Sequence, residues 1–204
     1  MQQRGNRWTH LALCVMDAVY SIGANHDTHT RPTVCRYAAL AALTNPLKRV
    51  HEVAAGSWAR DEVPLTALLA DLDQRGPEGF ADWVGNHQRT STRRGILKAE
   101  AVQHYARILV DHGVRCLADV TALLNDRTRF LTVQNELATV PGLGAHGVRQ
   151  AYLWMVAGDD ENVKPDRMVR WWLGRVLDQP VDPQEAQQLF VAAAAGLQVT
   201  QGQL

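Results

Sequence analysis

The chain has 204 residues, which is long enough to bury a core in one domain or in two packed lobes. Hydrophobic residues make up 46% and charged residues 21%, which is the composition of a folded globular protein. The 21 basic residues balance the 21 acidic ones, so the net charge neither favours nor excludes a nucleic-acid partner. No apolar run is long enough for a membrane span, and residues 1–7 lack the apolar core of a secretory signal. We therefore expect a cytoplasmic protein without a membrane partner.

The cysteines give no sign of a metal centre. Cys14, Cys35 and Cys116 lie far apart, and their spacing fits neither a zinc site nor an iron–sulfur cluster. Cys14 and Cys116 stand among apolar residues, which predicts buried thiols. We expect no metal site.

Helical patterns recur along the whole chain, whereas strand patterns are scarce. We therefore predict an all-α fold of about ten short helices. In chain order the expected helices are 10–20, 34–43, 64 to Gly76, one through Phe80 and Val84, 96–112, one capped by Asp119, 130–139, 148–156, 168–177 and 182–195. The expected loops are 25–32, 89–94 and 158–165.

The segment Val140-Pro141-Gly142-Leu143-Gly144 joins two of these helices. Two glycines one residue apart allow a tight turn with bare amides, and these amides and the next helix N-terminus favour a phosphate oxygen. Leu143 would anchor the turn in the core. We predict a DNA-backbone contact, without base preference, made by Pro141, Gly142, Leu143, Gly144, His146 and Gly147. The alternative is an ordinary glycine-rich turn with no ligand.

Several segments together resemble the helix-hairpin-helix DNA glycosylases, the superfamily of endonuclease III and the alkylbase glycosylases. They are Lys98-Ala99-Glu100, Val140 to Gly144, Val163 to Arg170 and, more weakly, Val19 to Asn25. The resemblance is strongest between residues 96 and 172, and residues 45–90 match nothing in that family.

The resemblance implies a helix-hairpin-helix glycosylase-like fold in two packed lobes, 1–25 plus 145–204 and 26–144, with one compact unit left open as an alternative. It implies a monomer that acts on double-stranded DNA containing a modified base. It requires no cofactor and leaves open a monovalent cation at the hairpin carbonyls.

Departures from the family pattern bear on the chemistry. His146 stands where bifunctional members carry the lysine that attacks the sugar, and the cluster cysteines are missing. The pattern therefore implies a monofunctional glycosylase or an inactive relative. Asp166 matches the catalytic aspartate, whose carboxylate would stabilise the oxocarbenium-like sugar and orient a water. Its alternative role is that of a helix N-cap.

Base flipping requires a wedge and a pocket. Ile22 and Asn25 are the wedge candidates, although they also fit an ordinary helix end. Asp17, Tyr20 and Trp154 are the base-pocket candidates. Asp17 could instead lie on a polar helix face or pair with a buried arginine. Most of the tryptophans, Trp171 and Trp172 included, could instead be core residues that only pack. The residues that could form a basic DNA face are Arg93, Arg94, Lys98, Arg149, Arg167 and Arg170.

Three functions remain open from the sequence. The leading one is a monofunctional DNA glycosylase, and the second is a helix-hairpin-helix module that binds DNA without chemistry. A distant third is an unrelated enzyme that uses His26, His29 and His146. The base that would be excised is not specified by the sequence.

Overall fold

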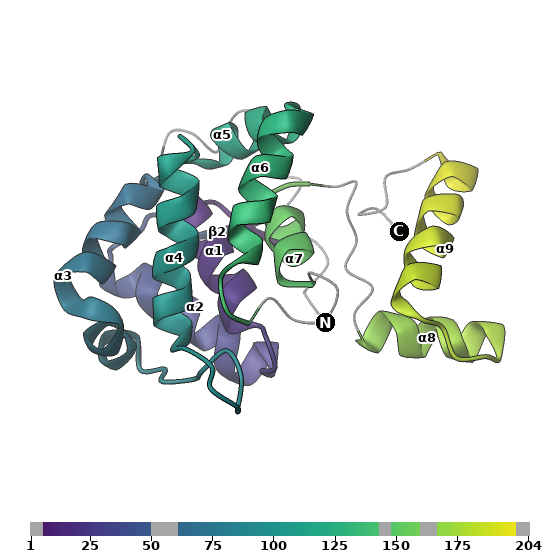
Figure 1. Cartoon of the computed structure of the whole chain (residues 1–204), viewed down its shortest axis with the longest axis horizontal. Coiled ribbons are helices and arrows are strands. Elements are labelled where there is room, and N and C mark those ends of the chain that lie inside the picture. The colour runs from purple at the N-terminus through teal and green to yellow at the C-terminus, as the bar shows by residue number, and fades with distance from the viewer. Residues whose placement is uncertain (1–5, 50–60, 143–147, 160–166, 199–204) are drawn as a thin grey trace.

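The computed structural model describes residues 6–49, 61–142, 148–159 and 167–198. Within these ranges the chain is mostly helical, as predicted for an all-α protein (Figure 1). The helices are α1 Leu11–Tyr20, the π-helical turn η1 His26–Thr30, α2 Arg31–Leu40, α3 Leu65–Val84, α4 Lys98–Asp111, α5 Leu117–Leu124, α6 Arg127–Ala138, α7 Val148–Val156, α8 Arg167–Leu177 and α9 Pro183–Leu197.

Most predicted helices are confirmed, and three local differences have physical reasons. Gly76 does interrupt α3, with a φ of 67°, but a second helical segment follows it directly, so the helix kinks rather than ends. The expected loop at 25–32 contains η1 because the side chain of Asn25 caps it, accepting from the amides of Asp27 and Thr28. The N-cap of α5 is Cys116 rather than Asp119, which is the N3 residue of the capping box.

Two short strands were not predicted. β1 Asn6–Trp8 and β2 Leu47–Arg49 form an antiparallel pair in which Asn6 lies opposite Arg49 and Trp8 opposite Leu47. Three residues per strand are too few to show a period-two pattern in the sequence. The pair fixes the segment before α1, which brings Trp8 against the core.

Helix α1 is the centre of the protein, since every one of its residues is buried. Helices α2, α3, α4 and α7 pack around it (Figure 1). A helix that is apolar all round must be enclosed by other elements, and one hydrophobic cluster extends from Trp8 to Ala157 through all of these helices. Asp17 is the only carboxylate on α1, and it lies inside this cluster with no exposed surface.

The carboxylate of Glu62 joins two helix N-termini. Its oxygens accept hydrogen bonds from the amide of Leu11 at 2.9 Å and from the amide of Leu117 at 3.0 Å. Burial raises the pKa of Glu62, while the two amide donors oppose that shift. The side chain of His10 does not cap α1, so Glu62, which is distant in sequence, supplies the acceptor for the N-terminus of α1.

Helices α8 and α9 pack on each other around a second, small cluster of Leu173, Val181 and Ala186. Figure 1 shows this pair beside the body formed by α1 to α7. Trp171 and Trp172 are more than half exposed, at 56% and 57%, so packing does not account for either of them here. Residues of both lobes expected from the sequence contribute to the large cluster, and the division into those lobes stays a prediction.

Within the described ranges, no helix has the length and apolarity that a bilayer span requires.

Candidate nucleic-acid interface

The first part of the predicted hairpin is described, and the second part is not. Val140 follows α6, is buried, and is continued by Pro141 and Gly142, while Leu143, Gly144, His146 and Gly147 lie outside the described residues. Gly142 has a φ of 88°, in the region that favours glycine. The described part is therefore the end of α6 followed by a glycine with a positive φ, and the hairpin itself stays a prediction.

A buried arginine holds the carbonyl side of this turn. Arg149, in the first turn of α7, donates from Nη2 to the carbonyl of Val140 at 2.7 Å and from Nη1 to that of Pro141 at 3.0 Å. Its Nε donates to the hydroxyl of Tyr105 at 2.6 Å, and the guanidinium lies 4.3 Å from the centre of the Tyr105 ring. The start of α7, the turn and α4 are thus joined through one side chain that is 1% exposed.

The loop between α3 and α4 packs directly against the hairpin. A Cβ atom added to Gly142 would lie 2.4 Å from Cβ of Thr90, a distance that real Cβ atoms do not show. The loop is itself closed, because the amide of Thr90 donates to the carbonyl of Ile96 and Arg89 donates to the carbonyl of Gly95. The absence of a side chain at Gly142 therefore allows both its positive φ and the close approach of Thr90.

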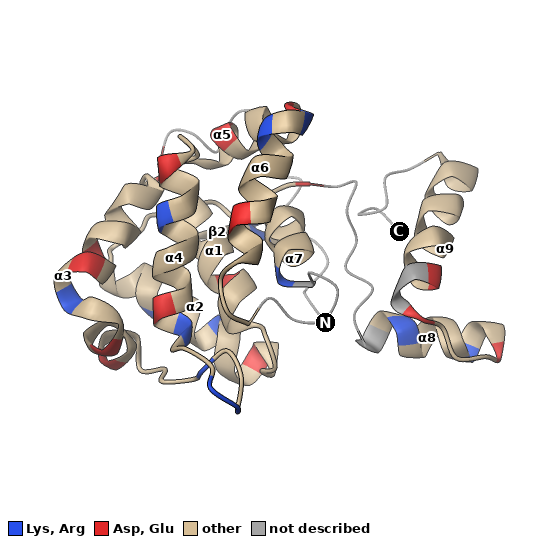
Figure 2. Cartoon of the chain, viewed as in Figure 1, with Lys and Arg blue, Asp and Glu red and all other residues tan. Residues whose placement is uncertain are grey.

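This loop presents exposed polar and basic side chains beside the hairpin. Ser91, Thr92, Arg93 and Arg94 are all exposed. Figure 2 shows the basic loop at one end of the body, whereas charges of both signs are mixed elsewhere. The loop and the hairpin thus form one face, which we call the hairpin face: Thr90 to Arg94 and Val140 to Gly142.

Two of the six residues expected on a basic surface are not on it. Lys98 and Arg149 are each 1% exposed, because their charged groups turn inward to backbone carbonyls. Arg170 is partly buried and donates to the carbonyl of Val181. The side chain of Arg167 lies outside the described residues. Arg93 and Arg94 are the exposed members of the set.

Lys98 connects the family-like Lys-Ala-Glu segment to the end of α1. Its Nζ donates to the carbonyls of Tyr20 at 2.8 Å and Ile22 at 2.7 Å, and to Oε1 of Gln88 at 2.9 Å. Burial lowers the pKa of Lys98 to about 8. The ammonium therefore satisfies the last carbonyls of α1 and fixes the proposed wedge loop to the start of α4.

The two wedge candidates, Ile22 and Asn25, differ in whether their side chains already have a structural role. Asn25 is exposed, but its Oδ1 already accepts the two amides at the start of η1. Ile22 is partly exposed, and its carbonyl is held by Lys98. Of the two, Ile22 has the side chain without a structural hydrogen bond, and the wedge assignment stays a prediction.

Asp17 is held by hydrogen bonds to three side chains in the described part of the chain. Trp8 Nε1 donates at 2.6 Å, the hydroxyl of Tyr152 at 3.3 Å, and His26 Nε2 lies 3.2 Å away. The hydrogen bond to Asp17 is the main cause that raises the pKa of His26, and burial opposes it. This satisfied network explains how α1 tolerates an interior carboxylate.

The other two base-pocket candidates are core residues in this conformation. Tyr20 is fully buried and Trp154 is 1% exposed. Trp154 packs against Phe130 of α6 in a tilted arrangement, with ring centres 5.3 Å apart, whereas α7 contacts Asp17 through Tyr152. The hydroxyl of Tyr20 and Nε1 of Trp154 are buried and have no hydrogen-bond partner among the residues that the structure describes. The base-pocket assignment stays a prediction, and an incoming base would require these side chains to move.

Asp166 lies outside the described residues, immediately before α8. Its roles as catalytic carboxylate or helix N-cap both stay predictions. His146, which belongs to the third candidate function, is likewise not described. His29 is exposed, with Nδ1 2.7 Å from Oγ1 of Thr28. Among the described side chains, no group of three or more histidines, cysteines and carboxylates is arranged to hold a metal.

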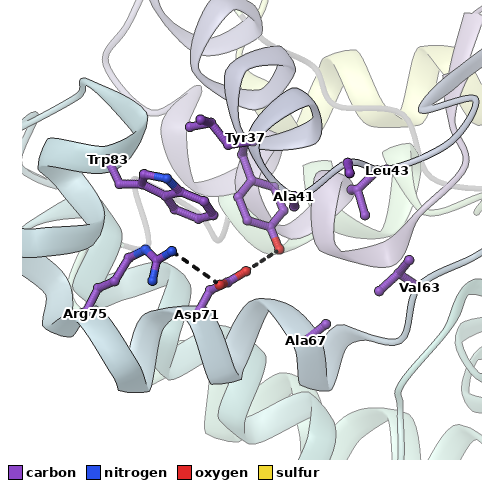
Figure 3. A pocket seen from close by; sticks show the side chains of 10 residues that line it. Tyr37, Ala41, Leu43, Val63, Ala67, Asp71, Arg75 and Trp83 are labelled. Atoms are coloured by element: carbon purple, nitrogen blue, oxygen red, sulfur yellow. Dashed lines mark hydrogen bonds and ion pairs between the residues drawn. The ribbon is translucent and has the colours of Figure 1, made fainter.

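A cavity of about 300 Å³ lies away from this face, between the end of α2 and α3 (Figure 3). Arg75 lies 4.0 Å over the Trp83 ring, and the carboxylate of Asp71 points to both Arg75 and the hydroxyl of Tyr37. Asp71 and Arg75 are four residues apart on α3, which is the only sequence signal for this cluster.

The interactions that sequence reasoning missed have a recognisable signal. Lys98 shares a helical stripe with Val102, Tyr105 and Leu109, all buried. Arg149 is in the same situation, four residues before the fully buried Leu153. A basic residue on an apolar stripe predicts a buried charge with specific acceptors.

The chain belongs to the family described as a domain of unknown function, DUF8548, whose model matches residues 1–204. No curated protein and no solved structure matches the chain.

Proposed function

We propose that this protein binds the backbone of double-stranded DNA through the hairpin face. The observation that carries the proposal is the fixed turn after Val140, whose carbonyls are held inward by Arg149 while Thr90 packs against Gly142. The amide of Val140 already donates to the carbonyl of Leu137, and Pro141 has no N–H, so among the described residues it is the N-terminus of α7 that offers amides to an external acceptor. A phosphate oxygen is the acceptor that this charge distribution favours.

The exposed residues Arg93 and Arg94 support the same ligand. They stand on the loop that contacts the hairpin, so both phosphate-binding elements lie on one face. Contacts from amides and arginines to phosphates position a protein on DNA without reading sequence. The neutral net charge is compatible with this because the local distribution, and not the total, attracts DNA.

As the activity, we propose monofunctional removal of a modified base. The support is the resemblance of the segments around Lys98, the hairpin and Asp166 to the helix-hairpin-helix glycosylases. A water oriented by Asp166 would attack C1′ of the sugar, and the base would leave with the electron pair of the N-glycosidic bond. With His146 in place of the family lysine, water rather than an amine is the nucleophile.

A DNA-binding module without chemistry is the second candidate. The observation that favours it is the complete burial of Asp17, Tyr20 and Trp154, which leaves none of them open to a flipped base. Both candidates share the hairpin contact and differ only in base release.

Fluorescence anisotropy with a labelled duplex tests the shared part. We expect the logarithm of the affinity to fall linearly with the logarithm of the salt concentration, because phosphate contacts release counterions. Replacing both Arg93 and Arg94 by glutamine should lower the slope, whereas Arg107→Gln, on an exposed arginine paired with Asp73, should leave it unchanged. Absent or salt-independent binding contradicts the proposal.

A further inference from the structure

The resemblance leaves open a monovalent cation at the hairpin carbonyls, and the described half of the hairpin does not fit one. A cation there would need carbonyl oxygens as ligands. The carbonyls of Val140 and Pro141 instead accept from the guanidinium of Arg149, at 2.7 and 3.0 Å. An ion bound to these oxygens would lie next to a permanent positive charge.

The guanidinium of Arg149 is held in one position by several contacts. All three nitrogens of the guanidinium donate to named acceptors, two carbonyls and the hydroxyl of Tyr105. The group is 1% exposed and stacked on the Tyr105 ring, and Tyr105 is itself fully buried. Such a planar fork suits two adjacent carbonyls in a way that a lysine would not.

The charge of Arg149 has no carboxylate partner among the described residues. Its acceptors are neutral carbonyls and a phenol. A buried charge whose described partners are all neutral is stabilised further by an anion that approaches from outside. The hairpin face, where that anion would bind, is formed by the same turn that the guanidinium holds.

We infer that Arg149 is a built-in cation of the hairpin, which takes the place of a bound monovalent ion and adds its charge to the attraction for a phosphate. This inference rests on the proposed DNA-backbone contact for its second part. Its first part, the replacement of an ion, concerns the free protein and can be tested without DNA. Arg149 acts through the turn, so it is a positioning residue.

The first test compares the native chain in potassium, sodium and tetramethylammonium chloride at one ionic strength. Tetramethylammonium is too large to be held by two carbonyls of one turn. An ion that binds the folded state raises the melting temperature with its concentration. We expect the same melting temperature in the three salts, and a rise specific to potassium or sodium would overturn the inference.

The second test measures affinity for a labelled duplex in the same three salts. We expect dissociation constants that agree within about twofold, since only the ionic strength should matter. Arg149→Gln should weaken binding by about tenfold or more, while the matched control Arg107→Gln changes it by less than about twofold. An affinity that requires potassium, or an Arg149→Gln variant that binds like the native chain, would overturn the inference.

The two tests separate this inference from the proposed function. If the duplex does not bind in any salt, the proposed function fails, and the melting temperatures still decide whether an ion binds. If Arg149→Gln does not fold, the comparison of salts on the native chain remains decisive.

Discussion

The ammonium of Lys98 lies 2.7 Å from the carbonyl oxygen of Ile22, so the start of α4 is tied directly to the loop after α1. The same group also holds the carbonyl of Tyr20 and the side chain of Gln88, which leads into the loop that packs against the hairpin. One buried lysine therefore connects the proposed wedge loop, the basic loop and the central helix. The positions of these parts depend on each other.

The burial of Lys98 predicts a specific pH dependence of stability. Its pKa is about 8 in the folded protein and 10.5 ordinarily, so between these values the unfolded chain binds a proton that the folded chain does not. The free energy of unfolding should therefore rise with pH across this window, by up to about 1.4 kcal/mol per pH unit. Urea unfolding of the native chain and of Lys98→Met across the window isolates this term. We expect the free energy of unfolding of the native chain, minus that of Lys98→Met, to rise with pH. A difference that stays constant or falls with pH contradicts the prediction.

Gly142 should be intolerant of a side chain for two reasons. Its φ of 88° strains any other residue, and an added Cβ would meet Thr90. We expect Gly142→Ala to lower the free energy of unfolding by about 2 kcal/mol and to weaken duplex binding. Gly76→Ala is the control, because Gly76 also has a positive φ but has open space around it and lies in α3. Both variants should lose stability, as followed by urea unfolding.

Only Gly142→Ala should lose affinity for the duplex, measured by anisotropy at a temperature where both variants are folded. Equal affinities for Gly142→Ala and Gly76→Ala would separate the turn from DNA binding.

Asp17 should be a structural carboxylate. Asp17→Asn replaces a carboxylate that is hydrogen-bonded to three side chains by an amide, so it should cost about 1.5–3 kcal/mol, the range for hydrogen bonds to charged groups. The matched control is Asp27→Asn, since Asp27 lies 3.6 Å from the same histidine but is exposed, and such a pair contributes less than about 1 kcal/mol. Chemical denaturation measures both. Equal stability of the two variants would show that the Asp17 network contributes little.

Glu62 should stabilise two helices at once. Glu62→Ala removes the acceptor of the Leu11 and Leu117 amides, and with about 1 kcal/mol for each cap the expected loss is about 2 kcal/mol. Asp61→Ala changes the neighbouring carboxylate, whose one hydrogen bond among the described residues is accepted from Asn45 at 3.4 Å on the surface. Thermal unfolding followed by circular dichroism compares the two. A loss no larger than that of Asp61→Ala contradicts the double cap.

Much of the fold was predictable because helix periods and helix ends are local signals. The bounds of α7 agree with the predicted ones, whereas Gly76, which was expected to end its helix, kinks α3 instead. The strand pair of Asn6–Trp8 and Leu47–Arg49 was not, because its partners are distant in sequence and three residues show no period.

The motifs of the candidate site can be recognised in the sequence, whereas the contacts of its side chains cannot. The hairpin is predicted from its glycines, whereas the inward direction of the Lys98 and Arg149 side chains depends on carbonyls supplied by other elements. A count of basic residues therefore placed both on a surface that they do not reach. The clue was their position on apolar helical stripes, which only a buried acceptor could satisfy.

Release of free base from duplex oligonucleotides, each with one modified base, tests the proposed activity most directly, with the native chain compared with Asp166→Asn. We predict that the native chain releases one base of the panel and that Asp166→Asn binds the duplex but releases none. Equal release by both proteins would contradict the role of Asp166. Salt-dependent binding without release from any oligonucleotide in the panel would contradict the glycosylase and favour the module that binds DNA without chemistry.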